Sequence, residues 1–364
     1  MDAYARALES AVKPGDVVLD IGTGTGIAAV LACRLGAKRV YAVEPSDAIF
    51  VAQEIATANG VADRIEFIQG LSTEITLPQQ ADVIVSDLRG VLPVFEHHLV
   101  AIADARARHL APGGVLIPQS DSLWVSVAAA PDLFASIASD WGRRTYDLDL
   151  SAANRLAVNC ICKVRGSELN LLAPPALAGH IDYRSADPSR FAATASLAVT
   201  RAATAHGLCM WFDSILTDGV ELSNAPDRPP LVYGQAFFPW PEPIVLATGD
   251  RVSVSLAADL VAENYVWQWR TQVFEASGRL KADMRQSELQ GELMSPATLR
   301  MRAASHVAQL KDDGRIDALI LQLMDEAMPL GDIAREIAKL YPGRFARWQD
   351  ALARVGDLSV RYSR

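Results

Sequence analysis

Cysteine is scarce in this chain of 364 residues, which contains only four, and a disulfide framework is therefore excluded. Cys160 and Cys162 have neither the spacing nor the partner residues of a zinc site, so no metal is predicted. No apolar run reaches the roughly 18 residues that a membrane-spanning helix needs. The first ten residues lack the apolar segment of a secretory signal peptide. These absences predict a soluble, reduced, cytoplasmic protein with no membrane partner.

Basic residues are outnumbered by acidic ones, since 34 Lys and Arg face 43 Asp and Glu and the net charge is −9. Nucleic-acid binding needs clustered lysine and arginine for its phosphate contacts, so this balance argues against it. Half of the residues are hydrophobic, which is too apolar for a disordered chain. The length predicts two or three packed domains.

Short β-branched runs alternate with helical stretches over the first 120 residues. The strand at 16–21 has almost no polar face, as a strand covered on both sides should. A Gly-rich turn at 22–26 and a helix at 27–35 follow it. Later strands are expected at 39–43, 65–69, 82–86 and 115–117, with a second helix at 46–59. Strand–helix alternation with such short crossovers predicts a parallel, doubly wound α/β sheet.

Beyond Pro118 the pattern changes to short apolar runs punctuated by proline and glycine. These runs predict an antiparallel β domain over 121–293, in which the irregular stretch at about 140–189 is an insertion. The last segment, 294–364, is predicted to be a small helical domain. Its helices are expected at 316–324, 330–340 and 345–355, followed by a short strand at 358–362, LSVRY. This order is that of a winged-helix-like unit.

The strongest local signal is the sequence Asp20-Ile21-Gly22-Thr23-Gly24-Thr25-Gly26 between the first strand and its helix. Glycine at alternate positions lets a ligand lie on the backbone at the carboxyl end of a strand, where open α/β sheets bind ligands. Glu44 ends the second strand, and a carboxylate there can accept hydrogen bonds from both hydroxyls of a ribose. The two features predict a nucleoside ligand, either a nicotinamide dinucleotide or S-adenosylmethionine.

The stretch VVLDIGTGTGIAAVLACRLGAKRVYAVEPS resembles the first two motifs of Rossmann-like S-adenosylmethionine-dependent methyltransferases. Among these enzymes, the chain most resembles the protein arginine methyltransferase family. The similarity to that family continues through three further segments: RIEFIQGLSTEITLP, ADVIVSDLRGVLPVFEHHL and LAPGGVLIP. PEPIVLATGDRVSVSL resembles the strands of that family's β-barrel. The resemblance spans residues 4 to 275. It implies a cofactor domain at 1–120, a β-barrel domain at 121–293 and a dimerisation arm at about 140–189, hence a homodimer.

The resemblance also implies roles for individual residues. S-adenosylmethionine, with S-adenosylhomocysteine as the product, would be held by the Gly-rich turn, the residues that end the second strand and the segment after the third. These residues are Asp20, Gly22, Thr23, Gly24, Gly26, Glu44, Pro45, Ser72, Thr73 and Glu74. The two carboxylates that grip the acceptor guanidinium in the family match Asp87 and Glu96. Carboxylates facing one cation would orient a nitrogen lone pair toward the methyl group.

Three departures from the family pattern fall on the acceptor side. Asp87 is one methylene shorter than the family's glutamate. Arg89 lies between the two acids, where it could pair with Asp87 or with Glu96. The family's Thr-His-Trp segment aligns with 231–233, so Val232 replaces a histidine that helps to manage the proton. Of the family's N-terminal helices only Tyr4 is matched.

The acceptor therefore has alternatives: arginine in a protein, a nitrogen or oxygen of a peptide natural product, or a small molecule. Two other functions stay open. The chain could be a catalytically weak, cofactor-binding partner of another methyltransferase, or a nicotinamide dehydrogenase. His97 and His98 are read as helix surface and not as metal ligands. The segment 294–364 is similar to small winged-helix peptide-binding domains of peptide-modifying enzymes, or is a packing or dimer element.

Overall fold

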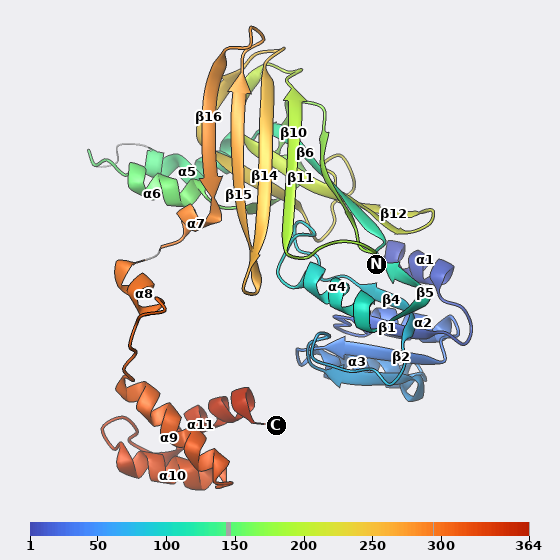
Figure 1. Ribbon diagram of the computed structural model, residues 1–364, viewed down its shortest axis with the longest axis vertical. Coiled ribbons are helices and arrows are strands. Elements are labelled where there is room, and N and C mark those ends of the chain that lie inside the picture. The colour runs from blue at the N-terminus through green and yellow to red at the C-terminus, as the bar shows by residue number, and fades with distance from the viewer. Residues whose placement is uncertain (143–146, 294, 364) are drawn as a thin grey trace. The chain divides into compact units, whose positions relative to one another are not determined.

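The computed structural model describes residues 1–142, 147–293 and 295–363 (Figure 1). They form two compact units, Met1–Leu293 and Met294–Arg364. Figure 1 shows that the first unit has an α/β layer at its N-terminal end and long antiparallel strands beyond it. None of the helices in the described ranges is long and apolar enough to cross a membrane.

A five-stranded parallel sheet forms the α/β part, in the order β3-β2-β1-β4-β5. Every residue of the central strand β1 is buried, which explains its unbroken apolar character. The strands are β1 (Val17–Ile21), β2 (Arg39–Glu44), β3 (Ile65–Gln69), β4 (Ala81–Ser86) and β5 (Leu110–Ile117), and the helices are α1 (Asp2–Ala11), α2 (Ile27–Arg34), α3 (Ala48–Ala58) and α4 (His98–Arg108). The predicted doubly wound parallel sheet is confirmed. Its order reverses at β1, which places the switch point between the carboxyl ends of β1 and β4.

The antiparallel part contains two sheets that face a common core. One has the order β10-β14-β15-β16; the other has β7-β13-β11-β6-β8, with β12 on β11 and β9 on β6. Within the described residues, strand pairing leaves these as two sheets and does not close a full barrel. The strands are β6 (Ser120–Ala129), β7 (Cys162–Val164), β8 (Asn170–Leu171), β9 (Ala176–Asp182), β10 (Arg190–Ala198), β11 (Ala203–Thr217), β12 (Val220–Ser223), β13 (Gln235–Leu246), β14 (Arg251–Val261), β15 (Asn264–Phe274) and β16 (Leu280–Ser287).

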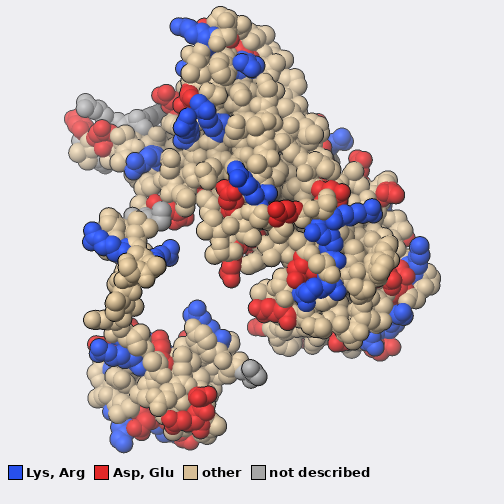
Figure 2. Space-filling model, in the orientation of Figure 1, with Lys and Arg blue, Asp and Glu red and all other residues tan. Residues whose placement is uncertain are grey.

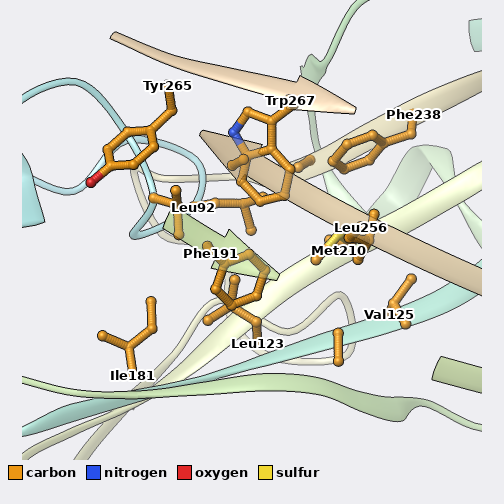
Figure 3. Packing of buried hydrophobic residues seen from close by; sticks show 14 of the residues in the cluster. Leu92, Leu123, Val125, Ile181, Phe191, Met210, Phe238, Leu256, Tyr265 and Trp267 are labelled. Carbon is orange, nitrogen blue, oxygen red and sulfur yellow. The ribbon is translucent and has the colours of Figure 1, made fainter. Parts of the chain in front are cut away.

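Aromatic side chains fill the space between the two sheets. Trp240 is fully buried, and Trp267 and Trp269 are 4% and 3% exposed, in line with their prediction as core. Figure 3 shows Leu92 beside this cluster, near Trp267. Leu92 belongs to the loop between β4 and α4, so that loop is fixed against the β domain by apolar packing.

The segment predicted as an arm, about 140–189, has mixed structure. Residues 143–146 lie outside the described part of the chain. The helices α5 (Pro131–Gly142) and α6 (Ser151–Val158) form an excursion between β6 and β7, whereas β8 and β9 belong to the sheet and pair with β6. The short helix α7 (Glu288–Gly291) follows β16 and closes the first unit.

The second unit contains four helices among its described residues: α8 (Pro296–Met301), α9 (Asp312–Asp325), α10 (Leu330–Leu340) and α11 (Trp348–Tyr362). The predicted strand LSVRY is wrong, because residues 358–362 continue α11. Ala351, Val355 and Leu358 recur at helical spacing and pack on the same core, and this packing keeps the segment helical.

Candidate functional site

A cavity of about 360 Å³ lies at the carboxyl ends of β1, β2 and β3, on the switch-point edge of the sheet. Predicted site residues that line it are Gly22, Pro45, Ser72, Thr73, Glu74 and Glu96. Leu88, His97, His98, Val100, Ala101 and Glu263 also line it. The last of these comes from the β domain, so the cavity is built by both parts of the first unit.

Of the Gly-rich turn, Gly22 lines this cavity, and the other predicted site residues are not among its described lining residues: Asp20, Thr23, Gly24, Gly26, Glu44 and Asp87. The glycines of the turn adopt backbone angles that other residues avoid. Gly22 has φ +71°, and a Cβ there would lie 2.4 Å from the side chain of Leu88. Gly26 has φ +81°, and its Cβ would lie 2.9 Å from that of Ala52. The amides of Gly22 and Thr23 donate to the carbonyl of Val43, which fixes the turn to β2.

Asp20 is a buried carboxylate at the root of the turn and is 3% exposed. The Thr23 hydroxyl donates to its Oδ2 at 2.6 Å. Burial raises the pKa of Asp20 to about 6, the Glu44 carboxylate adds to that rise, and the hydrogen bonds from Thr23 and the Ala29 backbone oppose it. Asp20 therefore stabilises the conformation of the turn through its hydrogen bond with Thr23.

Glu44 ends β2 and holds the turn through its side chain. Its Oε2 accepts from the Gly24 amide at 3.0 Å, and its Oε1 accepts from the Ser46 amide at 3.0 Å. Each carboxylate oxygen has two lone pairs, so a ligand hydroxyl can still donate to either one. Just before α3, Ser46 Oγ accepts from the Ala48 amide at 3.3 Å, and the N-cap residue Asp47 makes no side-chain cap bond.

Asp87 follows β4 and is already engaged by its neighbours. Arg89 donates to its Oδ1 from Nε and Nη2, each at 3.3 Å. The hydroxyl of Tyr233 donates to its Oδ2 at 2.5 Å. Of the two pairings considered for Arg89, the structure forms the one with Asp87. The described part of the chain has no ion pair between Arg89 and Glu96.

Arg89 is buried and makes hydrogen bonds to residues of both parts of the first unit. Its Nη1 donates to Asp121 Oδ1 at 3.1 Å and to Ser214 Oγ at 2.8 Å, and both acceptors belong to the β domain. Its Nη2 donates to the Tyr4 hydroxyl at 2.5 Å. The side chains of Arg89 and Asp121 are both completely buried, so the charge of each depends on the other.

His97 and His98 were both predicted to lie on the helix surface. His97 is exposed, but the prediction is wrong for His98. His98 is fully buried at the start of α4, with Nε2 2.9 Å from the hydroxyl of Tyr183. Tyr183 in turn donates to Asp121. Burial and the nearby charge of Arg89 lower the pKa of His98 well below its usual value, so the ring is neutral. No sequence signal marked this pairing, because Tyr183 lies 85 residues away.

Val232 occupies the aligned position of the family's histidine and is 79% exposed. Its neighbour Tyr233 is buried and reaches Asp87. The segment 231–233 therefore places a tyrosine hydroxyl, and no imidazole, against Asp87.

Comparison with known proteins identifies the family. A family profile described as ribosomal protein L11 methyltransferase matches residues 4–120, and one described as arginine methyltransferase oligomerization subdomain matches residues 121–270. The chain is similar to protein arginine N-methyltransferase PRMT10 of Oryza sativa subsp. japonica, with 30% identity over 321 residues, 77% of this chain and 83% of that protein. The chain belongs to the protein arginine methyltransferase family.

A further relative is probable protein arginine N-methyltransferase 6 of Arabidopsis thaliana, 32% identical over 221 residues. The match covers 58% of this chain, which spans only about half (51%) of the length of that relative. The family prediction, a Rossmann-like S-adenosylmethionine-dependent methyltransferase, is confirmed.

Two solved structures share the fold. One is protein arginine methyltransferase 10 of Arabidopsis thaliana, with a TM-score of 0.68, 24% identity, and coverage of 79% of this chain and 93% of that one. The other is the Trypanosoma brucei PRMT1 enzyme–prozyme heterotetrameric complex with AdoHcy, with a TM-score of 0.70 and the same identity and coverage. Both matches show that the fold of the first unit is shared.

Proposed function

We propose that the chain transfers a methyl group from S-adenosylmethionine to the guanidinium of arginine in a protein or peptide. One observation carries this proposal: Glu96, which aligns with a family acceptor carboxylate, lines the same cavity as the residues expected to hold the cofactor. Glu96 has φ +39°, a conformation that non-glycine residues rarely adopt. Strain of this kind persists where the surrounding structure fixes a side chain for function.

The residues around the cavity fit S-adenosylmethionine. Gly22 lines the cavity, and the space that its missing side chain leaves is filled by Leu88, which forms an apolar part of the wall. Glu44 offers lone pairs for ribose hydroxyls, and Ser72, Thr73 and Glu74 form the wall expected to meet the adenine. The cavity therefore suits the cofactor that the family uses.

When bound, S-adenosylmethionine supplies an electrophilic methyl group, which forms a bond to the acceptor nitrogen as its bond to sulfur breaks and the electron pair stays on sulfur. Glu96 would hold the guanidinium by charge-assisted hydrogen bonds and aim a nitrogen at the methyl group. The nitrogen gives up one proton after transfer, and the carboxylate of Glu96 is one group of the cavity that could receive it and pass it to solvent.

Methyl transfer to an Arg-Gly-rich peptide tests the proposal, with a peptide in which every arginine is replaced by lysine as the matched substrate. We expect mass spectrometry to find methyl groups on arginine alone. Glu96→Gln should lower the rate about 100- to 1,000-fold, because removal of one preorganised electrostatic group costs that much. Glu66→Gln, an exposed carboxylate on β3, is the control and should leave the rate unchanged. Methylation of only the lysine peptide or of a metabolite pool would contradict arginine as the acceptor.

Homodimer formation belongs to the same proposal. The helices α2 and α3 expose Ile27, Phe50 and Val51, and Trp141 of the α5–α6 excursion is 42% exposed. Apolar surface of this kind is typical of an interface. The match of 121–270 to an oligomerization subdomain supports this assignment. A cytoplasmic location stays a prediction from composition.

The second unit is proposed as a peptide- or protein-binding element, with nucleic acid disfavoured. Five of its described arginines pair with aspartates: Arg315 with Asp312, Arg335 with Asp332, Arg344 and Arg354 with Asp313, Arg354 with Asp317, and Arg347 with Asp350. Figure 2 shows acidic and basic atoms interspersed over this unit. Acidic partners beside these arginines weaken the attraction of this part of the chain for phosphates.

A further inference from the structure

Two of the four cysteines lie close together where the α5–α6 excursion rejoins the β domain. Cys160 follows α6, and Cys162 is the first residue of β7. Their Sγ atoms are 3.3 Å apart, and both residues are half-buried free thiols. The S–S bond of a disulfide is about 2.0 Å long, so a small approach of the two side chains would join them.

The backbone holds both thiols on one side of the chain. Residues two apart in an extended segment point to the same side, and the residue between them points to the other. Ile161 packs on the core between the two β sheets, whereas Cys162 packs on the separate cluster that contains Phe237. Both ends of the segment are fixed, because Asn159 Oδ1 accepts from the Ser287 amide at 3.0 Å and Cys162 pairs with Phe237 of β13.

The two thiols differ in acidity. The Cys160 thiol donates to the Ala157 carbonyl at 3.1 Å, and it can turn to donate to Cys162 once that residue ionises. The bond between the sulfurs lowers the pKa of Cys162, whereas the same bond, burial and the nearby Glu288 carboxylate raise the pKa of Cys160. Cys162 is therefore the more readily ionised of the two, and the thiolate is the form that reacts with oxidants.

The other two cysteines lie in different surroundings. Cys33 in α2 and Cys209 in β11 are 1% and 0% exposed, and burial raises the pKa of both thiols. Thiols buried among apolar side chains react slowly. They provide an internal reference for the reactivity of Cys160 and Cys162.

We propose that Cys160 and Cys162 form a redox-active dithiol, which a peroxide closes into an intramolecular disulfide. The Cys162 thiolate attacks one oxygen of hydrogen peroxide, the O–O bond breaks, and Cys162 becomes a sulfenic acid while the departing hydroxide takes up a proton. The sulfur of Cys160 then attacks that of Cys162, the S–O bond breaks, and water leaves with the proton of the Cys160 thiol. The two sulfurs lose two electrons, and the peroxide is reduced to two molecules of water. This inference does not depend on methyl transfer.

Oxidation of the reduced full-length chain with hydrogen peroxide tests the inference. Trypsin cleaves after Arg155 and Lys163, so one peptide, 156–163, contains both cysteines. Peroxide at about one equivalent should lower the mass of this peptide by about 2 Da, the mass of two hydrogens, and protect it from iodoacetamide. Dithiothreitol should reverse both changes. Cys33 and Cys209, alkylated after denaturation, should still be reduced.

Variants separate the roles of the two thiols. Cys160→Ser leaves Cys162 without a resolving thiol, so peroxide should give a sulfenic acid that dimedone traps. Cys162→Ser should react about 10-fold more slowly, because Cys160 retains its proton. Cys33→Ala is the matched control and should form the disulfide like the unmodified protein. Either of two results would overturn the inference: both cysteines of peptide 156–163 stay open to iodoacetamide after peroxide, or the disulfide that forms joins two chains.

Discussion

Asp20→Asn should make the first unit more stable at neutral pH while it weakens cofactor binding. Asp20 is buried, and its pKa is raised from 3.8 to about 6. A carboxyl whose folded-state pKa is raised binds its proton more tightly when folded. The free energy of unfolding therefore falls as pH rises from about 3.8 to about 6, and it falls no further above that range on account of Asp20. Each pKa unit corresponds to about 1.4 kcal/mol, so ionised Asp20 lowers the free energy of unfolding by up to about 3 kcal/mol at pH 7.

Asparagine keeps the size of the side chain and removes the buried charge. It can still accept from the Thr23 hydroxyl but loses the acceptor strength of a carboxylate, so 3 kcal/mol is an upper limit. Urea unfolding between pH 4 and 8, followed by tryptophan fluorescence, measures the difference. Six of the seven tryptophans lie in the first unit.

The stability gain from Asp20→Asn should be small near pH 4 and approach its maximum above pH 6.5. The exposed Asp63→Asn is the matched control and should show no such trend. A variant that is less stable than the unmodified protein at every pH would refute the reasoning, because Asp20 would then stabilise the fold through its charge.

Three further predictions concern the buried network and the interface. Arg89→Met should lower the free energy of unfolding by about 3–5 kcal/mol, because Asp121 is left as an unpaired buried charge, and adding Asp121→Leu should recover part of the loss in urea titrations. His98 has a lowered pKa, so its contribution is full above about pH 6.5 and is lost as pH falls; His98→Gln should flatten the acid side of the stability profile, and an unchanged slope would contradict the assignment. Phe50→Glu should shift a dimer toward monomer in analytical ultracentrifugation, whereas the exposed Glu54→Gln should not.

The strand ends and the Gly-rich turn near the cavity could be predicted from the sequence because their signals are local. The turn from Asp20 to Gly26 and the carboxylate Glu44 lie at the ends of strands whose apolar character marks them without a structure. The turn needs glycine for backbone angles that the chain itself imposes, so composition and spacing suffice. The short crossovers predict in addition that the sheet is parallel, whereas the strand order comes from the structure.

The acceptor side depends on contacts between distant residues, which spacing does not reveal. Arg89 has Asp87 as a near neighbour, but its fully buried partner Asp121 is 32 residues away and Ser214 is 125 residues away. Glu263 enters the cavity only through the placement of the β14–β15 hairpin. LSVRY was misassigned for a similar reason, since packing on the second unit's core overrides its β propensity.

Binding of S-adenosylhomocysteine to Glu44 and the Gly-rich turn tests the central claim most directly. Isothermal titration calorimetry should find saturable binding to the unmodified protein and to Glu66→Gln, and about 10- to 100-fold weaker binding to Glu44→Gln, which loses a charged acceptor for the ribose hydroxyls. NADH should bind more weakly than S-adenosylhomocysteine. Absence of S-adenosylhomocysteine binding, or equal affinity in Glu44→Gln, would contradict the account.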